Sequence, residues 1–296
     1  MIAAGNEIAM TRTFDAPREL VFAMWTNPDH VAWWFGPHGF SMTIESMDVR
    51  PGGSWKFVMH GPDGRNYDNH IIYRVIDPPS RLCYSHTTPK FDVEITFEDI
   101  EGKTLLTNRM IFDTAETRDR IAEEYGAVQG LEQTLSRLAD LAELTATAMT
   151  PGPEMVVTRV FDAPRELVFK ANTDPEMMLR WWGPHQTKNL LCEIDLRVGG
   201  EWHVKQDAFG QLQDFGGKYL EIDPPSRLVM TFEWGGAPGE ALTSYLVFED
   251  EAGKTRLTSR IVFNSPEIRD AMVSHGMAGG MMQSNERLDA LLKESQ

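Results

Sequence analysis

Apolar and polar residues alternate over residues 7–14, which is typical of a β-strand. Helix signals follow directly, because Pro17 fits the first position of a helix and Glu19 fits the first turn, where the helix dipole favours an anion. A second short helix is expected over residues 29–34, before the turn signal Gly36-Pro37. The chain therefore begins with one strand and two short helices.

From residue 40 to residue 112 the period is two, and short turns rich in glycine and proline separate the apolar runs. Such connections allow hairpins but are too short for helical crossovers, so the pattern predicts an antiparallel sheet. The expected strands cover residues 40–49, 55–59, 69–76, 81–86, 91–97 and 104–112.

A period of 3.6 residues returns over residues 115–144 and predicts one long helix. Its apolar face is formed by Ile121, Tyr125, Val128, Leu131, Leu135, Leu138 and Ala142. Because this helix has a single apolar stripe and the sheet alternates, each must cover the other.

The stretch Phe14–Phe22 returns letter for letter as Phe161–Phe169, about half a chain length later. The same order of strands and helices follows it and ends in a second long helix, expected over residues 267–293. The chain therefore contains two tandem copies of one fold. We expect a first domain over residues 1–147, a linker over 148–154 and a second domain over 155–296, each of the α+β class with a curved antiparallel sheet wrapped around its long C-terminal helix.

Composition excludes several classes of function. A net charge of −16 speaks against nucleic acid and anionic membranes as partners, because both require excess Lys and Arg. The sequence has no membrane-spanning run and no signal peptide, so a cytoplasmic protein is expected. Cys83 and Cys192 stand at non-equivalent places in the two copies, which favours two small buried side chains over a disulfide or metal site. No nucleotide fingerprint is present, and no cofactor is expected.

Several motifs occur once per copy. Trp181-Trp182-Gly183-Pro184 matches Trp34-Phe35-Gly36-Pro37, and a Gly-Gly-x-Trp turn and an Asp-Pro-Pro-Ser-Arg-Leu segment also recur. With the order of the elements, these motifs resemble the SRPBCC (START-like, helix-grip) superfamily. Within it, they resemble the family named after the activator of the heat-shock-protein-90 ATPase. The resemblance implies a helix-grip fold with a hydrophobic cavity between sheet and long helix, and it implies no defined reaction.

A small hydrophobic ligand is the expected occupant of this cavity, because aromatic and methionine side chains offer apolar surface. The alternative is that the same side chains form a filled core. The residues expected to line the cavity are Trp34, Phe35, Trp55, Phe57, Tyr125, Trp181, Trp182, Trp202, Tyr219, Met277, Met281, Met282 and Asn285.

The two long helices differ in bulk. Leu135 of the first copy corresponds to Asn285, and the second helix also contains Gly276, Gly279 and Gly280. Glycine weakens a helix by about 0.5–1 kcal/mol relative to alanine, so these positions suggest close backbone approach or open volume. We expect the second copy to hold the roomier pocket; the alternative is that these positions pack against the other domain.

His38 and His185 recur in register, but no partner residues repeat with them at metal-ligand spacing, so no metal site is expected. The alternative is that Trp34 and Trp181 wedge against the sheet and that the Gly-Pro-His turn lies at the surface. Asp48 and Asp195, each two residues before an arginine, are expected to form exposed ion pairs.

Four residues of the second copy could form an acid–base set: Glu201, His203, Asp214 and His275. Three classes of function thus stay open: a binder of small hydrophobic molecules, an interaction protein of the chaperone-activator type, and a cyclase- or hydrolase-like enzyme. A binder needs an apolar cavity, and an interaction protein needs an exposed apolar patch. An enzyme needs ionisable groups that converge on one site.

Overall fold

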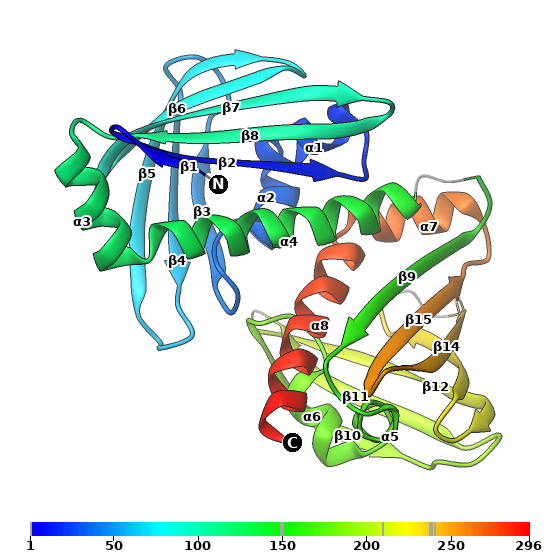
Figure 1. Ribbon diagram of the computed structural model, residues 1–296. Helices are drawn as coiled ribbons and strands as arrows, with labels where there is room; N and C mark the ends of the chain where they lie inside the picture. Colours follow the sequence, from blue (N-terminus) through cyan, green and yellow to red (C-terminus); the bar gives the residue numbers. More distant parts are fainter. Residues whose placement is uncertain (1, 149–150, 209, 237–238, 240) are drawn as a thin grey trace. The chain divides into compact units, whose positions relative to one another are not determined.

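The computed structural model describes residues 2–148, 151–208, 210–236, 239 and 241–296. The chain divides into two compact units, residues 1–146 and 147–296, which we call the first and second unit. Each unit combines one antiparallel sheet with two short and two longer helices (Figure 1). This is the expected α+β helix-grip architecture.

The sheet of the first unit has eight strands in the order β1-β2-β8-β7-β6-β5-β4-β3. Its first expected strand, β2, therefore pairs with its last, β8, as a sheet wrapped around a helix requires. The elements of this unit are β1 (Ile2–Ala4), β2 (Glu7–Phe14), α1 (Arg18–Thr26), α2 (Pro28–Trp34), β3 (Ser41–Met47), β4 (Ser54–His60), β5 (Asn66–Asp77), β6 (Arg81–Thr87), β7 (Lys90–Ile100), β8 (Lys103–Ile111), α3 (Ala115–Tyr125) and α4 (Ala127–Ala148).

Strand β1 was not expected from the sequence. It pairs antiparallel with the start of β2, with Ala3 opposite Ile8, and so extends the sheet beyond its predicted edge. Three residues are too few for alternation of apolar and polar positions to be recognised.

The second unit has a seven-stranded sheet in the order β10-β11-β12-β13-β14-β15-β9, the same topology without a described counterpart of β1. Its elements are β9 (Glu154–Phe161), α5 (Arg165–Ala171), α6 (Pro175–Trp181), β10 (Thr187–Ile194), β11 (Glu201–Ala208), β12 (Gln211–Asp223), β13 (Arg227–Trp234), β14 (Leu242–Glu251), β15 (Lys254–Val262), α7 (Pro266–Ser274) and α8 (Met277–Glu294).

The prediction of one long C-terminal helix per copy is wrong in one respect. Each is broken by a glycine in the left-handed conformation, Gly126 with φ 59° between α3 and α4, and Gly276 with φ 95° before α8. A residue with a side chain rarely adopts these angles, which explains glycine at both positions. The first long helix also continues to Ala148, so the expected linker begins within α4; residues 149 and 150 lie outside the described residues.

Helices cover one face of each sheet, which we call the inner face. In the first unit, Ile8 and Phe112 pack with Ile121 of α3, and the beginning of α4 lies against them. In the second unit, Leu288, Leu291 and Leu292 of α8 belong to the same buried cluster as strand residues. Helix and sheet are thus in direct contact in the main cluster of the second unit.

Candidate functional site

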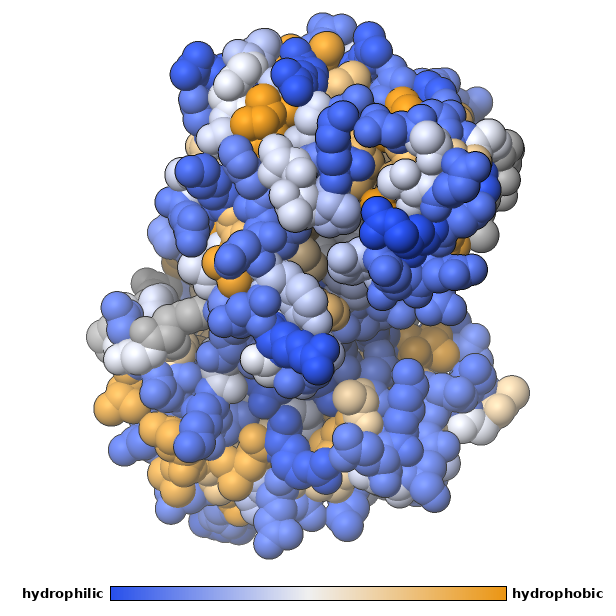
Figure 2. Space-filling model, turned by 90° about the vertical axis from the view of Figure 1, so that its left-hand side faces the viewer, coloured by the Kyte–Doolittle hydropathy of each residue, from blue (hydrophilic) through white to orange (hydrophobic). Residues whose placement is uncertain are grey.

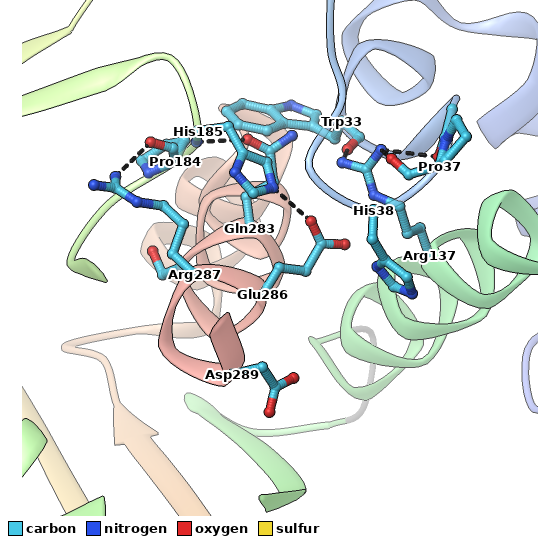
Figure 3. Close-up of polar contacts among 12 residues, drawn as sticks. Trp33, Pro37, His38, Arg137, Pro184, His185, Gln283, Glu286, Arg287 and Asp289 are labelled. Carbon is cyan, nitrogen blue, oxygen red and sulfur yellow. Dashed lines mark hydrogen bonds and ion pairs between the residues drawn. The ribbon is translucent and has the colours of Figure 1, made fainter. Parts of the chain in front are cut away.

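A loop with the sequence Trp-Gly-Pro-His lies between α6 and β10 in the second unit, and α8 holds it through Arg287. Nη1 of this side chain donates to the carbonyl oxygens of Pro184 at 2.8 Å and Gly183 at 2.9 Å, and Nη2 donates to that of Arg180 at 3.0 Å. Oε1 of Gln283, one turn earlier, accepts from the backbone N–H of His185 at 3.2 Å. Figure 3 shows both side chains directed at the loop.

The first unit repeats this arrangement. Nη1 of Arg137 donates to the carbonyl oxygens of Gly36 at 3.0 Å and Pro37 at 3.2 Å, and Oε1 of Gln133 accepts from the backbone N–H of His38 at 3.2 Å. In each unit a Gln and an Arg side chain of the long helix bind the backbone of this loop, and we call these contacts the loop clamp. Carbonyl groups at the end of a short helix have no partner within the helix, and the guanidinium supplies one.

The tryptophan that precedes each loop is buried. This agrees with the alternative interpretation of the motif, in which Trp34 and Trp181 wedge against the sheet. Nε1 of Trp34 donates to the carbonyl oxygen of Met24 at 3.0 Å, and Nε1 of Trp181 donates to that of Ala171 at 2.8 Å. Both indole N–H groups therefore have an acceptor, and both rings are part of the core.

One polar pair in the loop region was missed from the sequence. Nε2 of His185 lies 2.6 Å from Oε2 of Glu286 on α8 (Figure 3). Within the described residues, no group of three or more His, Cys, Asp or Glu side chains is placed to hold a metal ion. The pair fixes the imidazole ring beside the loop clamp.

The acid–base set suggested by the sequence is only partly assembled. Nε2 of His203 lies 2.8 Å from Oδ1 of Asp214, but both side chains are on the solvent side of the sheet. Glu201 forms an ion pair with Lys218 instead, and the His275 ring contacts the carbonyl oxygen of Ala271. Parity explains this outcome, because neighbouring residues of a strand point to opposite faces, and Trp202 takes the inner one.

Four aromatic rings lie together on the inner face of the second unit, and we call them the aromatic cluster: Trp182, Trp202, Phe215 and Phe232. Ring centroids are 4.7 Å apart for Trp182 and Phe215, and 5.9 Å apart for Trp202 and Phe232. Trp202 is buried, whereas the other three rings are only partly buried. Two of the four, Phe215 and Phe232, were not singled out from the sequence.

The remaining predicted residues of the second unit fall into two groups. Trp181 and Tyr219 belong to the same buried cluster as Trp202. Met277 and Met281 pack instead on a smaller cluster, formed by Met155, Leu242, Ile261 and Phe263. Phe232 contacts both clusters. Met282 is fully buried and Asn285 is half-buried.

In the first unit, Trp34, Trp55 and Phe57 are buried, and Phe35 packs edge-on to Trp55 with ring centroids 5.0 Å apart. Tyr125 does not belong with them. Its side chain is 60% exposed, because it ends α3 directly before the break at Gly126. The expectation that Tyr125 lines a cavity is therefore wrong.

A hollow of about 640 Å³ lies on the opposite, outer side of the first sheet. Cys83, Ser85 and Asp92 alternate with inner-face residues along β6 and β7 and line it together with Arg74 and Glu94. Ser85 donates to Asp92 at 2.5 Å and accepts from Arg74 at 2.9 Å, so these polar groups already satisfy one another.

Both sheets also expose apolar side chains, some of which Figure 2 shows gathered in patches on a mostly hydrophilic surface. Leu212, on β12, is 75% exposed. Among the described residues of the second unit, the other exposed large apolar side chains are Val156, Val160, Leu190, Leu196, Val198, Leu220 and Trp234. In the part of the chain that the structure describes, no helix is long and apolar enough to cross a membrane.

Two helix-grip units, each with a clamped Trp/Phe-Gly-Pro loop, define the class of this protein as a tandem helix-grip protein. A family model described as Activator of Hsp90 ATPase homolog 1-like protein matches residues 15–143 and again residues 162–293. The chain belongs to this family, with one copy in each unit. No curated protein matches the chain.

Solved structures similar to the chain come from several bacteria. A Nitrosomonas europaea protein is 24% identical with a TM-score of 0.45, over 50% of this chain and 98% of that protein. A Chromobacterium violaceum protein is 28% identical with a TM-score of 0.42, over 48% and 97%. The AHSA1 protein from Silicibacter pomeroyi is 21% identical with a TM-score of 0.42, over 48% and 99%. Each similarity spans about half of this chain.

Proposed function

We propose that the second unit binds a small hydrophobic or amphipathic molecule against the aromatic cluster. The observation that carries the proposal is that Trp182, Phe215 and Phe232 adjoin a buried core on the inner face and are themselves only partly buried. Aromatic faces exposed in this way bind apolar molecules, because each Å² of apolar surface removed from water contributes about 25 cal/mol.

Amide groups beside the rings would orient the polar end of such a ligand. Nε2 of Gln206 donates to Oδ1 of Asn189 at 3.0 Å, and Nδ2 of Asn189 donates to the carbonyl oxygen of Trp182 at 2.7 Å. Gln206 is 2% exposed, so this pair is a buried and ordered element of the site. Few polar groups in a mostly apolar surface are typical of a small-molecule site.

The loop clamp would hold the site in shape. Asn189 and Arg287 both bond the backbone carbonyl of Trp182, the latter at 3.3 Å, so the ring is fixed from the side of the loop. A ring that is already ordered loses little conformational entropy when a ligand packs on it, and affinity rises accordingly.

The proposal is tested with Nile red as the probe and the full chain as the protein. Phe215→Ala and Phe232→Ala are each expected to weaken Nile red binding about tenfold or more, because each removes one face of the aromatic cluster. The matched control is Tyr125→Ala, which removes an exposed ring of the first unit and is expected to leave binding unchanged.

Folding of each variant is checked by circular dichroism, and Phe215→Leu, which keeps apolar volume, is expected to retain most of the affinity. Unchanged Nile red binding in folded Phe215→Ala and Phe232→Ala would overturn the proposal. Native mass spectrometry of freshly purified protein provides a second test: a co-purified small molecule should be lost in the same two variants.

A further inference from the structure

Each of the two sheets has two edges, where backbone N–H and C=O groups have no neighbouring strand. An uncovered edge pairs readily with another strand, and proteins protect their edges with bulges, charged side chains, short strands or a covering segment. The edge strands β3 and β10 are both bulged, with register shifts between Ile44 and Ser46 and between Asn189 and Leu191. These two edges are therefore protected.

The edge at β2 is protected in a different way. The short strand β1 pairs with residues 7–9 of β2 and covers the beginning of the edge. Over the rest of β2 the exposed outer-face side chains are Thr11 and Thr13, which are polar. This edge therefore offers little apolar surface to another strand.

The free side of β9, which we call the open edge, lacks these protections (Figure 1). β9 pairs with β15 over its whole length without a register shift, and among the described residues no strand pairs with its other side. Its outer face carries Val156, Thr158 and Val160, and the two valines are 40% and 42% exposed. They take the places of Ala9 and Thr13 in β2. A straight edge with exposed apolar side chains is a template for strand pairing.

We propose that the open edge pairs with the open edge of a second copy of this chain. The two β9 strands would run antiparallel about a two-fold axis and join two seven-stranded sheets into one. Such self-facing pairing is the arrangement of most homodimers. Antiparallel strands exchange backbone hydrogen bonds, so each edge would satisfy the unpaired N–H and C=O groups of the other.

The pattern of side chains along β9 fits a copy of itself. The axis must pass through a residue, because an axis between two residues would set inner-face side chains opposite outer-face ones. With the axis through Thr158, Val156 of each copy stands opposite Val160 of the other, and Met155 stands opposite Phe161. The exposed valines of both copies then cover one another on the outer face. We call this arrangement the Thr158 register.

The neighbouring registers fit less well. An axis through Arg159 would set this cation opposite its own copy, and an axis through Val157 would set Val160 opposite Glu154. Like charges directly opposite one another are destabilising, and a valine opposite a carboxylate covers no apolar surface. The position of the valines therefore selects the Thr158 register.

The charges at the ends of β9 do not oppose this register. It sets Glu154 opposite Asp162, but both carboxylates have cationic partners in their own sheet. Glu154 accepts from Arg260 at 2.5 and 2.8 Å, and Asp162 forms an ion pair with a lysine of β15 at 3.3 Å. Repulsion between the two carboxylates is therefore offset within each copy.

Arg159 is the remaining charge of β9, and an inward-pointing charge can block an edge. Its side chain forms an ion pair with Asp289 of α8, on the inner face of the same unit. In the Thr158 register it stands opposite Val157 of the second copy, so no second cation approaches it. Arg159 is therefore compatible with the pairing.

The overall charge sets the expected strength of the dimer. Two copies with a net charge of −16 repel one another, and salt screens this repulsion. An interface formed mainly by one edge strand is small. We therefore expect a weak dimer that tightens as salt is added.

Sedimentation velocity of the full chain tests the proposal over about a thousandfold range of concentration. The expected result is a reversible dimer whose fraction rises with concentration and with salt. A chain that stays monomeric throughout would overturn the proposal. A dimer that dissociates as salt rises would also overturn it, because that behaviour indicates an ionic contact.

Two double variants test the register. Val156→Lys with Val160→Lys is expected to weaken the dimer about tenfold or more, because like charges then face one another twice across the axis. Both changes make the net charge less negative, so overall repulsion cannot cause that loss. Val156→Lys with Val160→Glu is expected to keep the dimer, because the same axis now pairs opposite charges. The matched control is Val198→Lys, at an exposed valine outside β9.

The control is expected to leave the dimer unchanged, and circular dichroism checks the folding of each variant. Equal losses of dimer in the control and in the double lysine variant would overturn the proposal. So would equal losses in the two double variants, because only the charges placed across the axis distinguish them.

A cross-link tests the position of the axis. Directly opposed residues of antiparallel strands have Cα atoms about 4.5–5.5 Å apart, within the range of a disulfide. In a background with Cys83→Ala and Cys192→Ala, Thr158→Cys is expected to form covalent dimers on mild oxidation about tenfold faster than Thr258→Cys. Thr258 lies opposite Thr158 on β15, one strand further from the axis. Equal rates for the two variants would overturn the Thr158 register.

The alternative occupant of the open edge is the N-terminal strand of another copy, since β1 covers the corresponding edge of the first unit. Ala3→Pro hinders pairing by β1 and is expected to leave the dimer unchanged. A dimer that is lost in this variant and kept in Val156→Lys with Val160→Lys would overturn the proposal in favour of strand exchange. Nile red binding tests the inner face and is judged separately.

Discussion

Nη1 of Arg287 lies 2.8 Å from the carbonyl oxygen of Pro184, and this bond joins the last helix of the second unit to the loop that presents Trp182. The side chain is largely buried, and desolvation lowers the pKa of its guanidinium below the ordinary arginine value. Every donor of such a buried cation needs an acceptor, and backbone carbonyl groups of the loop and of α6 supply several.

Arg287→Met is therefore expected to destabilise the second unit by about 2–4 kcal/mol, because it leaves buried carbonyl groups without donors. The measurement is urea unfolding of the full chain followed by tryptophan fluorescence. Arg256→Met is the control: this arginine forms an exposed ion pair with Glu251 at 2.9 Å and should change stability by less than about 0.5 kcal/mol. Equal effects of the two substitutions would contradict the clamp.

Gly217 on β12 allows the indole of Trp202 to reach its acceptor. A Cβ atom there would lie 2.0 Å from the carbonyl oxygen of Thr231 and 2.8 Å from Nε1 of Trp202. Gly217→Ala is expected to destabilise the second unit by roughly 2–4 kcal/mol, because backbone and ring must both move. A red shift of tryptophan emission before unfolding should accompany the loss, and a variant as stable as the parent would refute this account.

Gly280 in α8 gives the opposite prediction. The nearest atom to a Cβ placed there is Cγ of Pro184 at 3.9 Å, an ordinary contact, and the backbone is helical. Gly280→Ala should therefore stabilise the protein by about 0.5–1 kcal/mol, through the higher helix propensity of alanine. If it destabilises instead, the surroundings of α8 are tighter than the contacts indicate. Thermal unfolding of Gly280→Ala beside Gly217→Ala provides an internal comparison.

The thiol of Cys192 is expected to react slowly. Burial raises its pKa to about 11, and the carboxylates of Asp174 and Glu193 act in the same direction. At pH 8 its thiolate fraction is then about a hundredfold lower than in the unfolded chain, where the pKa is about 9, and labelling by iodoacetamide should slow accordingly. Peptide mass spectrometry measures the rate for each cysteine, with urea-unfolded protein as the reference.

The same shift predicts a pH dependence of stability. Because the folded pKa is raised, the unfolded thiol ionises first, and the stability that Cys192 contributes is lost as pH rises from about 9 to about 11. The measurement is urea unfolding at a series of pH values in the parent and in Cys192→Ala. An equally steep decline in both proteins would show that other groups are responsible.

The elements of the fold were largely predictable because their signals are local. Alternation predicted β2 with its observed bounds, and Pro17 indicated the start of α1 to within one residue, since it takes the N-cap position and not the expected first position of the helix. The break at Gly126 was not predicted, because the apolar stripe continues across it and only the positive φ of the glycine reveals the change of direction. Strand β1 was missed because it is too short to show a period.

The candidate site was predictable only where its residues repeat. Trp182 and Trp202 were found through motifs present in both copies, whereas Phe215 and Phe232 were missed because the first copy has Asn69 and His86 in their place. Glu286 was missed for the same reason, since Ser136 occupies its position in the first helix. The loop clamps did leave a signal, Gln and Arg four residues apart at 133 and 137 and again at 283 and 287, but their partners are backbone atoms that no side-chain pattern records.

The arginine of each loop clamp binds main-chain oxygens, and this affects how the sequences of the two units could diverge. A carbonyl group is the same whichever residue carries it, so the ring presented by the loop is interchangeable: Phe35 in one unit and Trp182 in the other stand directly before a Gly-Pro pair whose carbonyl groups the helix arginine binds. Residue 35 or 182 can therefore be substituted to change the side chain that the loop presents, while the hydrogen bonds that hold the loop are preserved.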